Sequence, residues 1–239
     1  FTGVNEGNIG SARIIKMLNV VEDNLVVESK GIYSIENYLT SRRLMYWQVY
    51  LHKTAVACEK VLINALNRAK FLRMTGHDIF ASPSLDYFLC NNIDASHFHT
   101  SPEALEHYSL LDDNDIWCAL KVWQKSNDKI LALLSSDVIN RHIFKVEVSD
   151  SPFPSDYVCQ IKEQLASHFN ISPDDTKHLY SIDTVQKDMY DINDDHISIL
   201  YKDGTLRDIA EASDILNISL LSRKVKKHYF CYQKIPDLT

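Results

Sequence analysis

The sequence has few residues that break secondary structure, and it has no long apolar run. Six of its 239 residues are glycine and six are proline, and neither type occurs between Gly31 and Gly76. So long a stretch without a breaker predicts one long helix, or two helices joined end to end. No apolar run approaches the roughly 18 residues that a membrane helix requires, so we expect no membrane association. A secretory leader pattern is also absent, which favours a cytoplasmic protein.

The five cysteines are scattered, and no two of them form a Cys-x-x-Cys pair. This spacing argues against a disulfide framework and against the common structural zinc sites, and it favours reduced thiols. The formal net charge of −7 argues against general nucleic-acid binding, because proteins of that class carry basic surfaces. A hydrophobic content of 45% is enough for a packed core and excludes disorder as the overall state.

Complete catalytic motifs are absent as well. The glycines near the start of the chain match neither a P-loop nor a dinucleotide-binding motif, and there is no Gly-x-Ser-x-Gly nucleophile motif. The pair His77-Asp78 invites a metal interpretation, but His52 is the only histidine upstream at a spacing that could add a ligand. We interpret the pair as coincidental, because two adjacent ligands need others to complete a coordination sphere.

The pattern of predicted elements changes near residue 141. Residues 1–141 are mainly helical, with a β-hairpin over residues 20–27 around an Asp-Asn turn. Residues 142–239 follow the order strand, helix, strand, strand, helix, strand, which is typical of a ferredoxin-like module. Its predicted strands are 144–148, 179–184, 197–201 and 229–232, and its predicted helices are 157–169 and 206–216. We therefore predict a mainly α region followed by a small α+β module.

The most informative residue of the long predicted helix is a cation inside its apolar stripe. Arg42 lies four residues after Tyr38 and four before Tyr46, and the same line continues to Tyr50 and Lys53. A buried guanidinium needs an anionic partner, because an unpaired buried charge is costly. The planar guanidinium can donate hydrogen bonds to two oxygens of a phosphate group at once, and tyrosine rings can pack against a base or a sugar. On the residues alone, a glutamate elsewhere in the fold is the more common partner for such a cation, and both partners stay open.

His52 lies beside Lys53, on the neighbouring line of the predicted helix. A single histidine at such a position is open to two interpretations, a core histidine whose hydrogen bonds are satisfied or a ligand contact.

Three segments of this region resemble a known family. They are Leu25–Gly31 (LVVESKG), Glu36–Arg42 (ENYLTSR) and Tyr50–Thr54 (YLHKT). Their pattern is similar to that of bacterial HD-domain phosphohydrolases related to deoxynucleoside triphosphate triphosphohydrolases. The likeness is specific over residues 1–60, moderate to about residue 145 and weak in the last module.

The resemblance implies an enzyme of which this chain is one part. Members of the family hold a divalent metal through a histidine, a His-Asp pair and a further aspartate, and they hydrolyse phosphate esters. All four ligands precede the position that matches Phe1, so the chain is expected to be the C-terminal part of a longer enzyme and inactive alone. The implied reaction converts a dNTP into a deoxynucleoside and triphosphate. The parent enzyme is expected to use Mg, Mn, Fe, Ni or Zn.

The resemblance also implies roles for individual residues. Arg42 matches an arginine that grips the triphosphate, and Tyr50 matches a tyrosine beside the sugar. Tyr46, His52 and Lys53 complete the predicted substrate-binding set. With these matches, the phosphate partner becomes the favoured one for Arg42.

A possible regulatory contact follows from the same likeness. Lys30 matches a lysine in the region where regulated members bind an activating nucleotide between subunits, which implies a homo-oligomer. Arg13 is the second possible contact, although Gly10 replaces the aspartate that relatives usually carry ahead of it. The alternative is a non-catalytic nucleotide-binding or oligomerisation module built on the hairpin and the long helix.

Overall fold

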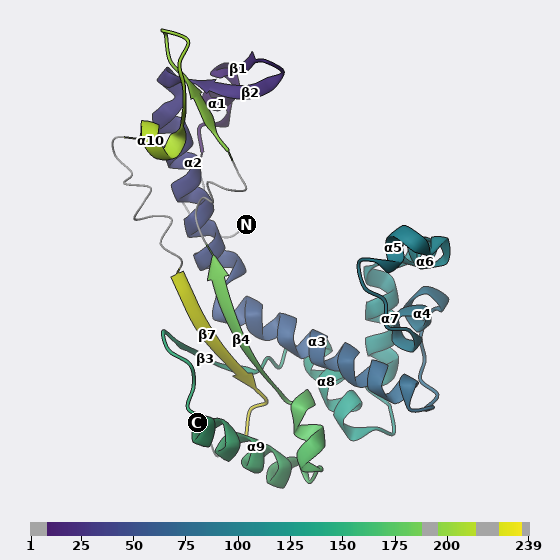
Figure 1. Ribbon diagram of the computed structural model, residues 1–239. Coiled ribbons are helices and arrows are strands. Elements are labelled where there is room, and N and C mark those ends of the chain that lie inside the picture. Colours follow the sequence, from purple (N-terminus) through teal and green to yellow (C-terminus); the bar gives the residue numbers. More distant parts are fainter. Residues whose placement is uncertain (1–8, 188–195, 214–224, 236–239) are drawn as a thin grey trace. The chain divides into compact units, whose positions relative to one another are not determined.

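The computed structural model of the protein describes residues 9–187, 196–213 and 225–235 and divides into two compact units (Figure 1). Unit 1 comprises residues 1–55 and 184–227, and unit 2 comprises residues 56–183 and 228–239. Each unit draws on both sides of residue 141, so contacts between segments far apart in the sequence define the units. As a division into domains, the boundary at residue 141 stays a prediction.

Unit 1 begins with a short helix and a hairpin, followed by a long helix. Its elements are α1 (Ser11–Lys16), β1 (Leu18–Val21), β2 (Asn24–Glu28), the 3-10 turn η2 (Ser29–Gly31), α2 (Ile32–Met45), the π-helical turn η3 (Tyr46–Tyr50), β5 (Ser198–Leu200), β6 (Leu206–Asp208) and α10 (Ile209–Ala212). The predicted hairpin is confirmed. Glu22 and Asp23 connect its strands with φ values of 49° and 60°, the positive values that two-residue hairpin turns require.

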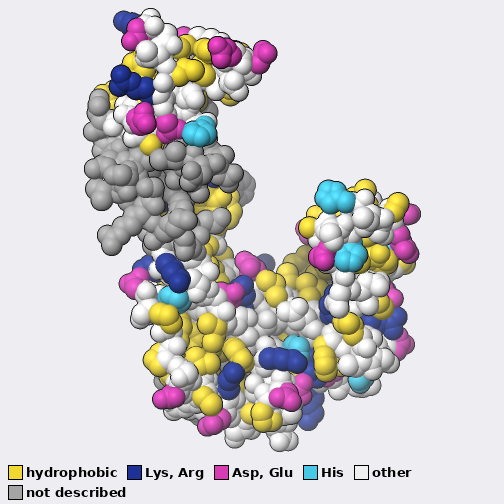
Figure 2. All heavy atoms as spheres, viewed as in Figure 1, with side chains coloured by type: hydrophobic (Ala, Val, Ile, Leu, Met, Phe, Trp, Pro, Cys, Tyr) yellow, Lys and Arg dark blue, Asp and Glu magenta, His cyan; other side chains and the backbone are white. Residues whose placement is uncertain are grey.

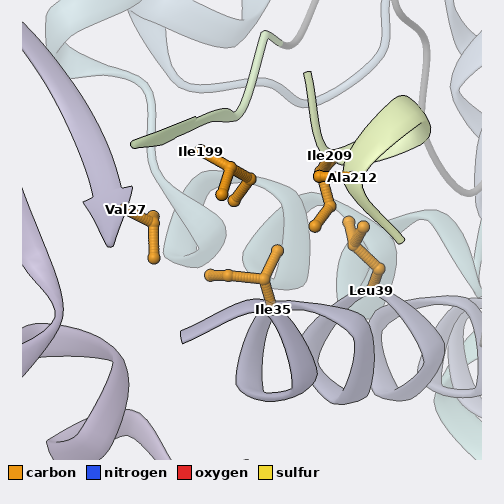
Figure 3. Packing of buried hydrophobic residues seen from close by; sticks show 6 residues of the cluster. All are labelled: Val27, Ile35, Leu39, Ile199, Ile209 and Ala212. Atoms are coloured by element: carbon orange, nitrogen blue, oxygen red, sulfur yellow. The ribbon is translucent and has the colours of Figure 1, made fainter. Parts of the chain in front are cut away.

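The strands of unit 1 form a four-stranded sheet in the order β1-β2-β5-β6. β2 pairs in parallel with β5, where Val27 lies opposite Ile199, and β5 pairs antiparallel with β6. This sheet packs against α2. Figure 3 shows the buried side chains that join them, Val27, Ile35, Leu39, Ile199, Ile209 and Ala212. Gly31 lies so close to β2 that an added Cβ would be 2.7 Å from Val27 Cγ1.

Unit 2 consists mainly of helices. Its elements are most of α3 (Lys53–Met74), α4 (Pro83–Cys90), α5 (His97–Thr100), α6 (Pro102–Leu110), α7 (Asp113–Trp123), α8 (Lys129–Asn140), β3 (Lys145–Ser149), α9 (Ser155–Phe169), η4 (Pro173–His178), the first half of β4 (Tyr180–Lys187) and most of β7 (Val225–Tyr232). Asp112 and Asp128 cap α7 and α8 by accepting backbone N–H bonds. The mainly α prediction is confirmed.

The ferredoxin-like arrangement is not confirmed. The strand predicted at 197–201 is β5, and it pairs with the hairpin of unit 1, whereas the other sheet has three strands in the order β3-β7-β4. The helix predicted over 206–216 is β6 at its start and α10 from Ile209 to Ala212, and residues 214–216 lie outside the described residues. Local patterns show where strands occur, but pairing with the apolar edge of β2 decides which sheet a strand joins.

Within the residues that the structure describes, none of the helices is long and apolar enough to span a bilayer.

Candidate functional site

The predicted substrate strip lies on α2 and the π-helical turn that follows it. The Leu51 N–H donates to the Tyr46 carbonyl oxygen, five residues earlier, at 2.7 Å. This bond widens the turn over Tyr46–Tyr50, between α2 and α3. Single π turns inside helices are rare and occur frequently at functional sites. The sequence pattern predicts a helix here, but it does not show the wider turn.

Arg42, Tyr46 and Tyr50 form a continuous strip along this helix. The guanidinium carbon of Arg42 lies 5.9 Å from the centre of the Tyr46 ring, which is a cation–π contact. The Tyr46 ring lies 5.5 Å from the Tyr50 ring, inclined by 48°. Arg42 and Tyr46 are half-buried, whereas 62% of the Tyr50 side chain is exposed. The strip therefore has a partly shielded cation at one end and an open aromatic ring at the other.

His52 and Lys53 follow the π-helical turn, and both are exposed. The His52 Nδ1 accepts a hydrogen bond from the Thr54 N–H at 3.3 Å, at the start of α3. The core interpretation of His52 is therefore wrong, because its ring lies at the surface beside a helix end. Lys53 is the first residue of α3 and adds a second positive charge to this part of unit 1.

An apolar cavity lies on the other side of Arg42 along α2. Tyr38, one turn before Arg42, lines this cavity of about 330 Å³. Most of its other walls are aliphatic, and they come from Ile9, Ile14, Ile15, Leu25, Val27, Ile35 and Ile197. The volume is at the lower end of the range for small-molecule pockets. The cation of the strip thus lies between an apolar hollow and an exposed ring.

The cavity has one polar pair that sequence reasoning missed. His196 lines it, and His196 Nδ1 lies 3.3 Å from Asp208 Oδ2. The other carboxylate oxygen of Asp208 accepts the Ala210 N–H and caps α10, which fixes the carboxylate beside the histidine. The sequence pattern indicates a solvated turn at His196, because nothing near it in the chain points to α1 or α2.

The two predicted regulatory contacts lie elsewhere in unit 1. Arg13 is on α1 and Lys30 is in the turn η2, and both side chains are exposed. Neither residue is part of the strip on α2 or of the cavity lining.

No group of three or more histidine, cysteine, aspartate or glutamate side chains is placed to hold a metal ion in the described part of the chain. His77 and Asp78 both lie in the segment after α3. His77 Nδ1 is 3.1 Å from the Thr75 hydroxyl, and Asp78 Oδ1 is 3.9 Å from the Arg73 guanidinium. Asp78 is fully exposed, and the described residues bring no further ligand to this pair.

Residues 9–81, which include the hairpin, α2, the π-helical turn and α3, match the family model of the HD associated region. A crystal structure of a phosphohydrolase from Bacteroides thetaiotaomicron has 58% sequence identity to the chain and a TM-score of 0.89, covering 97% of this chain and 58% of that one. Together, these two findings support an assignment to the HD-associated phosphohydrolases.

Two further proteins match nearly the whole chain. The uncharacterized protein YwfO of Bacillus subtilis is 28% identical over 98% of this chain and 52% of its own length. A hypothetical protein from Aquifex aeolicus has 21% identity and a TM-score of 0.58, covering 97% of this chain and 50% of its own, which shows a likeness of fold. The chain thus spans about half the length of the relatives that it matches.

Proposed function

We propose that the chain is the C-terminal part of a metal-dependent HD-family phosphohydrolase that converts dNTPs into deoxynucleosides and triphosphate. The observation that carries the proposal is the strip of Arg42, Tyr46 and Tyr50 inside the HD associated region. The phosphohydrolase neighbour supports the reaction class. The dNTP substrate is supported by the resemblance of the residues around Arg42 and Tyr50 to the triphosphohydrolases.

In this proposal Arg42 binds the phosphate chain. Its guanidinium can donate two parallel hydrogen bonds to phosphate oxygens and neutralise the negative charge that develops there. The Tyr46 ring lies against the guanidinium and restricts where it points. The exposed Tyr50 ring offers a flat apolar surface for the sugar or the base, and Lys53 adds a second cation.

The described residues do not fit the metal that the family uses, because they bring no three suitable ligands together. We therefore assign no step of this chain to the metal. The ligands would belong to the part of the relatives that the chain does not span, and the metal, when bound, would supply Lewis-acid chemistry and an activated water.

The test uses the full-length gene product that the proposal requires, with the release of triphosphate from dGTP measured in Mg²⁺ or Mn²⁺. We expect Arg42→Ala to lower kcat/KM by about 10²-fold, because a donor to the charged transition state is lost. Arg43→Ala is the matched control. It removes the same charge, but the next residue of a helix points about 100° away, so activity should stay close to that of the wild type.

Two results would contradict the proposal. Equal activity of the Arg42→Ala variant and the wild type would remove Arg42 from the substrate site. A full-length protein that hydrolyses no dNTP with any of the five metals would refute the assigned reaction.

A second candidate function is a nucleotide-binding and oligomerisation module without its own chemistry. It is favoured by apolar side chains exposed on the hairpin, with Val20 61% and Leu25 66% exposed. Figure 2 shows apolar side chains at the surface of the region of unit 1 that carries β1 and β2. Exposed apolar groups of this kind often mark interaction surfaces. Analytical ultracentrifugation with and without dGTP tests it, and a strict monomer that binds no dGTP would argue against it.

A further inference from the structure

Unit 2 contains a second hollow that the proposed function does not use. It lies between the segment that follows α3 and the C-terminal end of α7, and its volume is about 530 Å³. This volume falls within the range of small-molecule pockets. The lining residues are Leu72, His77, Asp78, Ile79, Phe80, Lys121, Val122, Trp123, Lys125, Ser126, Asn127 and Asp128.

Two exposed lysines provide the positive charges of this hollow. Lys121 lies in the last turn of α7 and Lys125 four residues later, and neither has an ion-pair partner within 4.0 Å among the described residues. The two aspartates in the lining do have partners. Asp128 accepts two hydrogen bonds from Arg68, at 3.1 and 2.6 Å, and Asp78 lies 3.9 Å from Arg73. Arg68 also pairs with Asp175, and Arg73 also pairs with Asp86, so the positive potential is confined to the face formed by Lys121 and Lys125, which attracts anions locally.

The apolar part of the lining comes from both elements that form the hollow, and a hydrogen bond joins them. The Trp123 Nε1–H donates to the Phe80 carbonyl oxygen at 2.8 Å, which ties the segment after α3 to α7. Trp123 is buried, whereas Phe80 and Val122 are 46% and 44% exposed and offer their apolar surfaces to a ligand. The hollow is thus preformed, with a cationic part and an apolar part.

We propose that this hollow binds a small organic phosphate. The phosphate group lies between Lys121 and Lys125, and its apolar or aromatic part lies against Phe80 and Val122. A phosphate monoester carries a charge of about −1.5 to −2 at neutral pH, which matches two ammonium groups. Lysine is a regular phosphate ligand, and an ammonium group on a flexible stem can adjust to the phosphate oxygens. The site lies in unit 2 and is independent of the strip on α2.

Fluorine NMR can test this site, because the chain contains three tryptophans, which are in distinct places. Trp123 lines the hollow, Trp117 is on the exposed part of α7, and Trp47 lies in the π-helical turn of unit 1. The chain would be labelled with 5-fluorotryptophan and titrated with phenyl phosphate, inorganic phosphate and phenol. We expect phenyl phosphate to shift the Trp123 signal saturably and to leave the Trp47 signal in place. Inorganic phosphate and phenol should bind more weakly, because each fills only one part of the hollow.

Charge substitutions then locate the phosphate. The double variant K121Q/K125Q should weaken the binding of phenyl phosphate by about tenfold or more, since two charge-assisted hydrogen bonds are lost. The matched control is K129Q/K202Q, which removes the same charge from two exposed lysines outside the hollow and should bind like the wild type. An unchanged Trp123 signal in the unliganded variants verifies that the fold is retained.

Several outcomes would overturn the proposal. They are the absence of a saturable shift, a shift confined to Trp47, and equal affinities of the wild type and K121Q/K125Q. Equal affinities for phenol and phenyl phosphate would show that the hollow recognises only the apolar part, which would refute a phosphate site.

Discussion

The two units bury different kinds of side chains. The described core of unit 1 contains a cluster of aliphatic residues from α2, β2, β5 and α10, and it also buries the carboxylate of Glu36, which accepts a hydrogen bond from Ser213. Unit 2 buries large rings, among them Trp123, Phe144, Phe230 and Tyr232, together with the charged side chain of Arg68. The candidate substrate strip lies in the unit with the simpler core. Unit 2, by contrast, depends on specific polar links between distant parts of the chain.

Arg68 is the centre of the polar links in unit 2. From α3 it donates hydrogen bonds to Asp128, the cap of α8, and to Asp175 in η4. Burial opposes the ionisation of Asp128, but the hydrogen bonds from Arg68 and the Leu131 N–H and the charge of Arg68 together offset this and keep its pKa below the usual value. One guanidinium thus holds three elements together. Unit 1 is therefore stabilised mainly by apolar contacts and has one buried carboxylate, whereas unit 2 also depends on a network of buried charges.

Removing the central cation of unit 2 should have the largest effect. We expect Arg68→Ala to lower the free energy of unfolding of this unit by about 3 to 5 kcal/mol, because Asp128 and Asp175 lose their shared partner. Urea unfolding monitored by fluorine signals would follow Trp123 for unit 2 and Trp47 for unit 1. Arg73→Ala is the control, since Arg73 pairs with Asp86 nearer the surface and its loss should cost less. An unchanged midpoint for Trp123 would show that the network does not stabilise unit 2.

A steric change should have a smaller effect, and on unit 1. In Gly31→Ala the new Cβ would lie 2.7 Å from Val27 Cγ1 and 3.0 Å from Met17 Cβ. We expect a loss of about 1 to 3 kcal/mol, because overpacking forces the hairpin away from α2. The Trp47 signal should report a lower urea midpoint. Gly10→Ala has its nearest side-chain atom at 4.0 Å and serves as the control. Identical midpoints for the two variants would mean that the hairpin adjusts without cost.

A third predicted effect is a pH dependence of unit 2, which develops only as the pH falls below neutrality. Burial, with a contribution from the nearby charge of Arg68, lowers the pKa of His178 to about 4 from an ordinary value of 6.5. Between these values the unfolded chain binds a proton that the folded unit does not. The stabilising contribution of the neutral ring is therefore complete above pH 6.5 and is lost as the pH falls toward 4.

His178→Phe keeps a ring at this position and removes the titration. We expect the Trp123 midpoint of this variant to fall less steeply than that of the wild type between pH 6.5 and pH 4.5. The Trp47 midpoint provides the internal reference for other titrating groups. Parallel curves for the two proteins would contradict the assignment of this pH dependence to His178.

Much of the local structure could be predicted from the sequence. The hairpin follows from two apolar runs around Asp23 and Asn24, and the caps Asp112 and Asp128 follow from their places before apolar-periodic segments. These features depend on residues a few positions apart, so local patterns reveal them. The alignment of Arg42 with Tyr46 and Tyr50 was predictable for the same reason.

Other features could not be predicted, because their partners are distant in the sequence. In the sequence, Arg68 is one of several cations in a predicted helix. The aspartates that accept its hydrogen bonds are 60 and 107 positions away in the chain. His196 lies among acidic residues in the sequence, and only the fold brings it to the cavity beside Tyr38. The π-helical turn at Tyr46–Tyr50 has no glycine or proline to indicate it.

The sequence by itself thus determined the helices that lack glycine and proline, the hairpin, the helix caps and the strip of one cation and two aromatic rings. Each of these features depends on neighbouring residues and on helical spacing. The tertiary structure alone decided which sheet β5 joined, how Arg68 was neutralised and where two hollows formed. Those outcomes depend on pairing and close packing between segments far apart in the chain, and no local pattern encodes that choice.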